Sequence, residues 1–149
     1  VISKKLSDVS PGYAIYNDQS PGINTKINLR IGGTNPDPYL GMLPSSSDVV
    51  LNRWQHWAVS YDPVKQTVMW FKNGNNDKTY AGINIGNMDS GNSRSLTFGY
   101  AETWGTFPTI HYQGYLDNVR IYPRALLASE ISAIYAETAG AYRDVTSIY

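Results

Sequence analysis

Carboxylate side chains are too widely spaced in this sequence to form an evident catalytic pair. A retaining glycosidase needs two carboxyl groups about 5 Å apart, as on one face of a single strand. The chain has three glutamates, Glu102, Glu130 and Glu137, and the last two fall in a predicted C-terminal helix. No predicted strand carries two carboxylates two or four residues apart, and no metalloprotease, serine-hydrolase or phosphate-loop motif occurs. The sequence therefore indicates a protein that is not an enzyme.

Histidine and cysteine usage does not indicate a metal centre. The two histidines, His56 and His111, are far apart in the sequence, and the chain contains no cysteine. Thiolate metal ligands and disulfides are therefore excluded. We expect His56 to be a hydrogen-bonded structural residue of a strand.

Aromatic residues in two long loops are better candidates for a binding site, because loops on a rigid scaffold often carry function. An aromatic ring can stack on a sugar while a nearby carboxylate accepts hydrogen bonds from its hydroxyls. The candidates are Tyr100, Glu102 and Trp104 in the later loop and Asp37 and Tyr39 in the earlier one. The alternative for Trp104 is that it folds back over the end of the fold as part of the scaffold.

The composition fits an uncharged partner. Lys plus Arg and Asp plus Glu each number 12, so the formal net charge is zero. This balance argues against nucleic acid or an anionic membrane as the partner, and no apolar run reaches the ~20 residues of a membrane span. The 12 tyrosines and 4 tryptophans suit a neutral hydroxylated ligand such as a glycan. Strand-rich proteins also use such residues for structure alone.

Hydrophobic alternation and turn signals place many short strands before one late helix. The predicted strands are residues 12–18, 27–33, 52–61, 66–74, 95–100 and 111–122. Asn73-Gly74 predicts a tight hairpin, the Pro- and Ser-rich residues 34–48 predict a loop, and helical spacing begins at Pro123. This order predicts an all-β antiparallel sandwich with one short helix, although the pattern alone leaves jelly rolls and barrels open.

The strand predicted over 52–61 decides how its two tryptophans are interpreted. Trp57, Val59 and Tyr61 share the face with the larger side chains, which we expect to point into the sandwich. We therefore interpret Trp54 and Trp57 mostly as scaffold.

Three motifs occur in an order that resembles a known family. They are "WQHWAVSYD", "VMWFKNG" and "YQGYLDNVRIYPRALLASEISAIY". Together with the opening "VISKK", they resemble the laminin-G-like, concanavalin A-like jelly rolls over roughly residues 1 to 135. The resemblance implies that residues 1–149 form a single antiparallel jelly-roll domain.

The same resemblance implies a function class. Its first implication is a non-catalytic recognition or adhesion module, extracellular or on a cell or virion surface, with glycan as the leading ligand. A second implication is a structural or decoration subunit of a surface layer, appendage or virion, bound to protein neighbours. A weaker alternative is a diverged glycoside hydrolase.

Asp117 is the candidate metal ligand. The family often places an acidic pair of this strand near a structural calcium, but the second member is Asn118 here. The apolar positions change parity between Leu116 and Val119, which predicts either a bulge or an inward-facing Asp117. If calcium binds, we expect Asp117 beside it; the alternative is an aspartate bonded only to backbone.

The ends of the sequence differ from those of the family. Relatives begin with further core strands, whereas this sequence opens at Val1, so we expect an unpaired sheet edge. Residues 136–149 extend past the usual end, and residues 142–149 are β-prone and alternating. We expect 142–149 to form a strand on a vacant edge, in its own sandwich or a neighbour's. Self-association, or a neighbouring chain that completes the edge, would follow.

Overall fold

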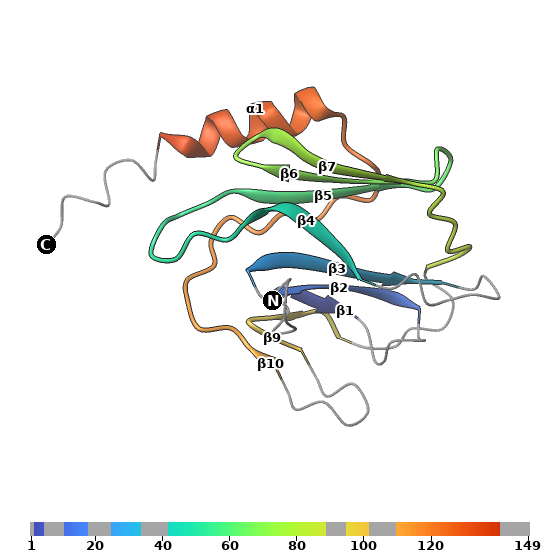
Figure 1. The fold of residues 1–149 in the computed structure, drawn as a ribbon, viewed down its shortest axis with the longest axis horizontal. Coiled ribbons are helices and arrows are strands. Elements are labelled where there is room, and N and C mark those ends of the chain that lie inside the picture. The colour runs from blue at the N-terminus through green and yellow to red at the C-terminus, as the bar shows by residue number, and fades with distance from the viewer. Residues whose placement is uncertain are drawn as a thin grey trace, which may run out of the picture.

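The computed structural model describes residues 2–4, 11–17, 25–33, 42–88, 95–101 and 110–140. Within this part of the chain, two antiparallel sheets face each other and one helix lies outside the second sheet (Figure 1). This confirms the predicted all-β sandwich with a short helix.

The first sheet has five strands in the described residues, in the spatial order β4-β3-β2-β1-β8. They are β1 (Ile2–Lys4), β2 (Gly12–Asn17), β3 (Lys26–Gly32), β4 (Leu43–Asp48) and β8 (Thr97–Phe98). Ile15, Leu29 and Leu43 stand side by side across β2, β3 and β4. β2 and β3 confirm the strands predicted over 12–18 and 27–33.

β4 corrects the loop predicted over residues 34–48. Residues 43–48 form an edge strand in which Leu43 and Ser45 are buried. An edge strand tolerates Pro44, because one side of its backbone needs no ladder hydrogen bond. The Pro and Ser content that indicated a loop therefore marks a sheet edge here.

The second sheet has the order β5-β6-β7. Its strands are β5 (Trp57–Asp62), β6 (Thr67–Lys72) and β7 (Asn75–Ala81), and a small separate sheet joins β9 (Tyr100–Ala101) to β10 (Ile110–His111). Asn73 and Gly74 link β6 to β7 with φ values of 50° and 76°. Positive φ at both positions is the signature of the predicted tight hairpin turn. The strand predicted from residue 52 begins only at Trp57.

The hydrophobic core lies between the two sheets. Its buried residues are Leu29, Ile31 and Leu43 from the first sheet, Val68 and Trp70 from the second, and Ile83 and Ile85 beyond β7. Trp57, Val59 and Tyr61 pack against this cluster, which confirms the predicted inward face of β5. The rings of Trp57 and Trp70 meet nearly at right angles, with centroids 6.3 Å apart, a favourable aromatic geometry.

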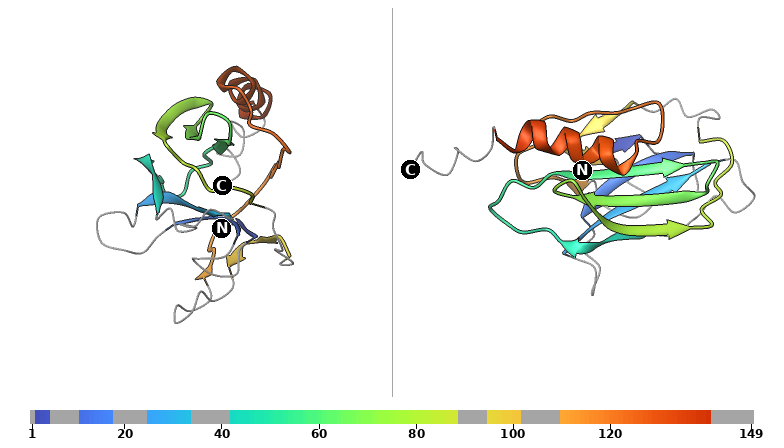
Figure 2. Two further views of the ribbon diagram at one scale, coloured as in Figure 1. Left: turned by 90° about the vertical axis from the view of Figure 1, so that its right-hand side faces the viewer. Right: turned by 90° about the horizontal axis from the view of Figure 1, so that it is seen from above.

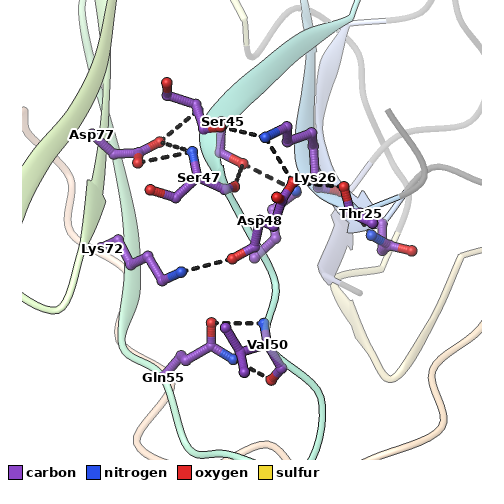
Figure 3. Close-up of polar contacts among 12 residues, drawn as sticks. Thr25, Lys26, Ser45, Ser47, Asp48, Val50, Gln55, Lys72 and Asp77 are labelled. Atoms are coloured by element: carbon purple, nitrogen blue, oxygen red, sulfur yellow. Dashed lines mark hydrogen bonds and ion pairs between the residues drawn. The ribbon is translucent and has the colours of Figure 1, made fainter. Parts of the chain in front are cut away.

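Polar contacts join the two sheets along β4 and β7 (Figure 3). The Asp77 carboxylate on β7 accepts the backbone N–H groups of Ser46 at 2.6 Å and Ser47 at 3.0 Å. The Lys72 ammonium on β6 donates to the Asp48 carbonyl at 2.6 Å. One side of the sandwich is therefore closed by backbone-directed hydrogen bonds.

Helix α1 (Ala128–Ala139) covers the outer face of the second sheet (Figure 1). Phe71, Leu126 and Ile131 are buried beneath it, with Ala58, Met69 and Ile134 packed around them. The helix starts at Ala128 rather than at the predicted Pro123. Leu127 is the N-cap, and the Glu130 carboxylate accepts its N–H at 2.8 Å. Glu130 thus makes the half of a capping box that satisfies the N-cap N–H, whereas the other half needs a polar N-cap side chain that leucine does not have.

The strand predicted over residues 111–122 is wrong for most of its length. Only His111 belongs to a strand, β10, and residues 112–127 have no regular secondary structure. Asn118 has a φ of 50°. This left-handed backbone conformation accommodates the change in the alternation of apolar residues between Leu116 and Val119. Asp117 is exposed rather than directed inward. In Figure 2 this segment (orange) runs along the side of the sandwich opposite β4.

Candidate functional site

Tyr100 is the one predicted ligand-binding residue that lies in the described part of the chain. It pairs with His111 across β9 and β10, and their rings stack at 6.4 Å between centroids with planes 25° apart. The Thr97 hydroxyl lies 2.8 Å from the Tyr100 carbonyl and 3.2 Å from that of Ser3. These contacts hold a partly exposed aromatic pair against the end of the first sheet.

The other four candidates, Asp37, Tyr39, Glu102 and Trp104, lie outside the described residues. For Glu102 and Trp104, the pairing of β9 with β10 still limits which segment of the chain they belong to. Ala101 pairs with Ile110, so residues 102–109 are the connection of an antiparallel hairpin whose two ends meet. Glu102 and Trp104 therefore belong to the same short connection that the Tyr100 and His111 pair anchors.

Among the residues that the structure describes, Asp117 does not lie in a cluster of metal-ligating side chains. Its Oδ1 accepts the N–H of Asn118 at 2.7 Å. No group of three or more His, Cys, Asp or Glu side chains suited to a metal occurs among the described residues. Calcium binding near Asp117 therefore stays a prediction.

Trp54 and Tyr115 form an exposed aromatic pair that the sequence analysis missed. Their ring centroids are 6.4 Å apart, and their exposed fractions are 43% and 84%. Trp54 is thus not scaffold, in contrast to Trp57. Strand alternation assigned Trp54 to the non-core face, and only the position of residues 112–127 shows what it contacts there.

His56 is a structural residue in a partly buried position, as predicted, but without the expected hydrogen bond at Nδ1. This atom is buried and has no partner within the described part of the chain. The ring packs on Tyr135 of α1, 5.7 Å between centroids. Burial, with a contribution from the charge of Arg120, lowers the pKa of His56 below its usual value of 6.5. The neutral imidazole therefore serves as packing surface for the helix.

Two comparisons identify what the chain resembles. A family model described as the concanavalin A-like lectin/glucanases superfamily (Laminin_G_3) matches residues 2–132. The fold is similar to the crystal structure of part of an S-layer domain-containing protein from Clostridium thermocellum, with a TM-score of 0.53 and 19% sequence identity. That match covers 88% of this chain and 65% of the other. No curated protein sequence matches the chain.

No helix in the described residues is long and apolar enough to cross a membrane.

Proposed function

Because the chain belongs to the concanavalin A-like lectin/glucanases superfamily, we propose that it is a non-catalytic recognition or adhesion module of an extracellular or surface-exposed assembly. The proposed ligand is carbohydrate. The zero formal net charge and the abundance of tyrosine support a neutral hydroxylated ligand.

The stacked pair of Tyr100 and His111 is the observation that carries this proposal. A ring held by a neighbouring ring and by a β-ladder loses little conformational entropy when a sugar stacks on it. In the sequence, a carboxylate, Glu102, and an indole, Trp104, follow Tyr100 closely, in the connection between β9 and β10. Stacking plus directed hydrogen bonding is the chemistry that neutral sugars require.

A glycan array followed by calorimetry on the best ligand tests the proposal. We expect Trp104→Ala and Tyr100→Ala each to weaken binding about tenfold or more, which corresponds to about 1.4 kcal/mol or more. Trp54→Ala is the matched control, because it removes an exposed aromatic residue that belongs to neither β9 nor β10 and should leave affinity unchanged. Loss of binding only in the control would place the site elsewhere, and an array without any bound glycan would refute carbohydrate recognition.

A second candidate function is structural, as a building block or decoration of a surface layer, appendage or virion. The shared fold with an S-layer domain-containing protein and the exposed apolar residues of segment 112–122 favour it. Obligate self-association in light scattering, together with an array that shows no bound glycan, would support this role instead. Hydrolysis of a β-glucan would contradict both candidate functions and would support a diverged glycoside hydrolase instead.

A further inference from the structure

A side-chain amide in the first sheet is buried without a hydrogen-bond partner. Asn28 on β3 is 0% exposed, and neither its Oδ1 nor its Nδ2 has a partner within the described part of the chain. Removing an amide from water without replacing its hydrogen bonds is unfavourable. Buried polar groups in native proteins are nearly always satisfied, so an exception of this kind indicates a functional contact.

The alternation of β3 places this amide on the outer face of the first sheet, the face directed away from the second sheet. Leu29 and Ile31 point into the core, so Asn28 and Arg30 occupy the other side of the strand. On β2, Tyr16 stands directly opposite Asn28. The amide therefore lies on the side of the sheet that neither the core nor α1 reaches (Figure 1).

The residues in the neighbouring positions of this face are small. Ala14 stands opposite Arg30, and Ser3 stands opposite Ala14. Gly12 and Gly32 form the next pair along β2 and β3. Short side chains beside a buried amide allow another molecule to approach the backbone of the sheet closely.

Tyr16 and Arg30 hold each other beside Asn28. Arg30 Nε donates to the Tyr16 hydroxyl at 2.5 Å, and the guanidinium carbon lies 5.9 Å from the centre of the Tyr16 ring. The strands β1, β2 and β3 carry no carboxylate side chain. Hard cations prefer several charged oxygen ligands, so these strands favour an uncharged polar ligand over a metal ion.

The stacked pair of Tyr100 and His111 lies on the same side of the first sheet. Figure 1 and Figure 2 show β9 and β10 beyond this sheet, away from α1. The Thr97 hydroxyl on β8 joins the two parts, because it lies 2.8 Å from the Tyr100 carbonyl and 3.2 Å from the Ser3 carbonyl. From β8 to β3 the sheet has three strand spacings, roughly 14 Å at about 4.8 Å each. One oligosaccharide can span that distance.

We propose that the outer face around Asn28 is a subsite for a neutral saccharide and that the Asn28 amide forms its hydrogen bonds. The amide accepts at Oδ1 and donates two bonds at Nδ2. Two neighbouring hydroxyl groups of a sugar ring match this set, since each hydroxyl can both donate and accept. Because Asn28 has no exposed area, the sugar must displace the groups that cover the amide.

This subsite rests on the proposed carbohydrate recognition and extends it from Tyr100 across the first sheet. The strand predicted over residues 142–149 lies outside the described residues, and the subsite draws on none of them.

The side-chain signals of Asn28 test the proposal in the unmodified protein. The probe is the neutral oligosaccharide that binds best on the glycan array, titrated into a ¹⁵N-labelled sample. We expect the Nδ2 proton signals of Asn28 to shift and to saturate with the dissociation constant that calorimetry gives. The Nδ2 signals of Asn17, which donates to the Lys26 carbonyl at 2.8 Å, should not shift. Unshifted Asn28 signals at saturation would overturn the proposal.

Asn28→Leu separates a binding role from a structural one. Leucine has nearly the shape of asparagine and no polar atom to satisfy, so this variant should melt at a higher temperature than the parent when no glycan is added. It should also bind the oligosaccharide at least about tenfold more weakly. Asn17→Leu is the matched control, because it removes an amide that has a partner. The control should melt at a lower temperature and keep its affinity.

The outcomes distinguish this subsite from the proposed function itself. A lower melting temperature of Asn28→Leu would show that the amide is already satisfied, as by a buried water, and would overturn the proposal. Unchanged affinity of Asn28→Leu, together with weaker binding by Tyr100→Ala, would overturn the subsite and leave carbohydrate recognition at Tyr100 intact. An array without any bound glycan would instead refute the proposed function and, with it, the ligand assigned to Asn28.

Discussion

The Asp77 carboxylate on β7 lies 3.0 Å from the backbone nitrogen of Ser47 on β4. It bonds the neighbouring amide of Ser46 as well, so one side chain satisfies two backbone donors of an edge strand that belongs to the other sheet. β4 has no further neighbour in the first sheet within the described residues. This contact is therefore a main polar link between the sheets.

Asp77→Ala should lower the free energy of unfolding by about 2 kcal/mol, because two hydrogen bonds to a charged acceptor are lost. Urea unfolding at neutral pH measures the change. Glu137→Gln is the control, since it removes a carboxylate from an exposed ion pair and should cost well under about 1 kcal/mol. Equal effects of the two substitutions would show that the link between β4 and β7 adds nothing to stability.

Gly74 and Gly82 form a matched pair for testing how α1 docks on the second sheet. Both have positive φ, 76° and 75°, so alanine at either position should cost about 1 kcal/mol in backbone strain. A Cβ on Gly74 would lie 2.9 Å from Cδ1 of Tyr135, whereas one on Gly82 would meet nothing within 4 Å. Gly74→Ala should therefore be at least about 1 kcal/mol worse. Identical melting temperatures for the two variants would mean that the helix is not held at the hairpin.

Stability should depend on pH through Glu130. The hydrogen bond from Arg124, followed by that from the Leu127 N–H, lowers the pKa of this carboxyl from 4.5 to about 2. The native state thus binds this proton less tightly than the unfolded chain. The stabilisation is complete above about pH 4.5 and is lost as the pH falls towards 2. Glu130→Gln should be less stable than the parent at pH 7, with a difference that shrinks in urea titrations below pH 4. A difference that stays constant with pH would contradict this assignment.

Calcium should raise the melting temperature if Asp117 is a ligand, and EDTA should lower it. The site would draw on Asp117 and on oxygen atoms near it, since hard cations prefer oxygen ligands. Asp117→Asn should abolish the response without changing the melting temperature in EDTA. An unchanged melting curve with calcium and with EDTA would show that the prediction of calcium binding is wrong.

Local sequence rules were sufficient for the elements whose neighbours are close in sequence. Asn73-Gly74 predicted its hairpin because only residues that tolerate positive φ fit a two-residue turn. Trp57, Val59 and Tyr61 revealed the core face of β5 by alternation alone. Among the candidate site residues, Tyr100 was selected because an aromatic residue next to a long loop suggests a binding platform, and its role in binding stays a prediction. Its stacking on His111 could not be predicted from the sequence.

Contacts between distant segments were decided only by the tertiary structure. Pro44 and the serines of β4 indicate a loop until an edge position and Asp77 supply what their backbone needs. The residues from Tyr112 to Tyr122 have a strand-like sequence, yet a strand exists only where another backbone completes its hydrogen bonds. The exposure of Trp54 could not be predicted from the sequence either. Alternation tells which side of a strand a residue occupies, but not whether another segment covers that side.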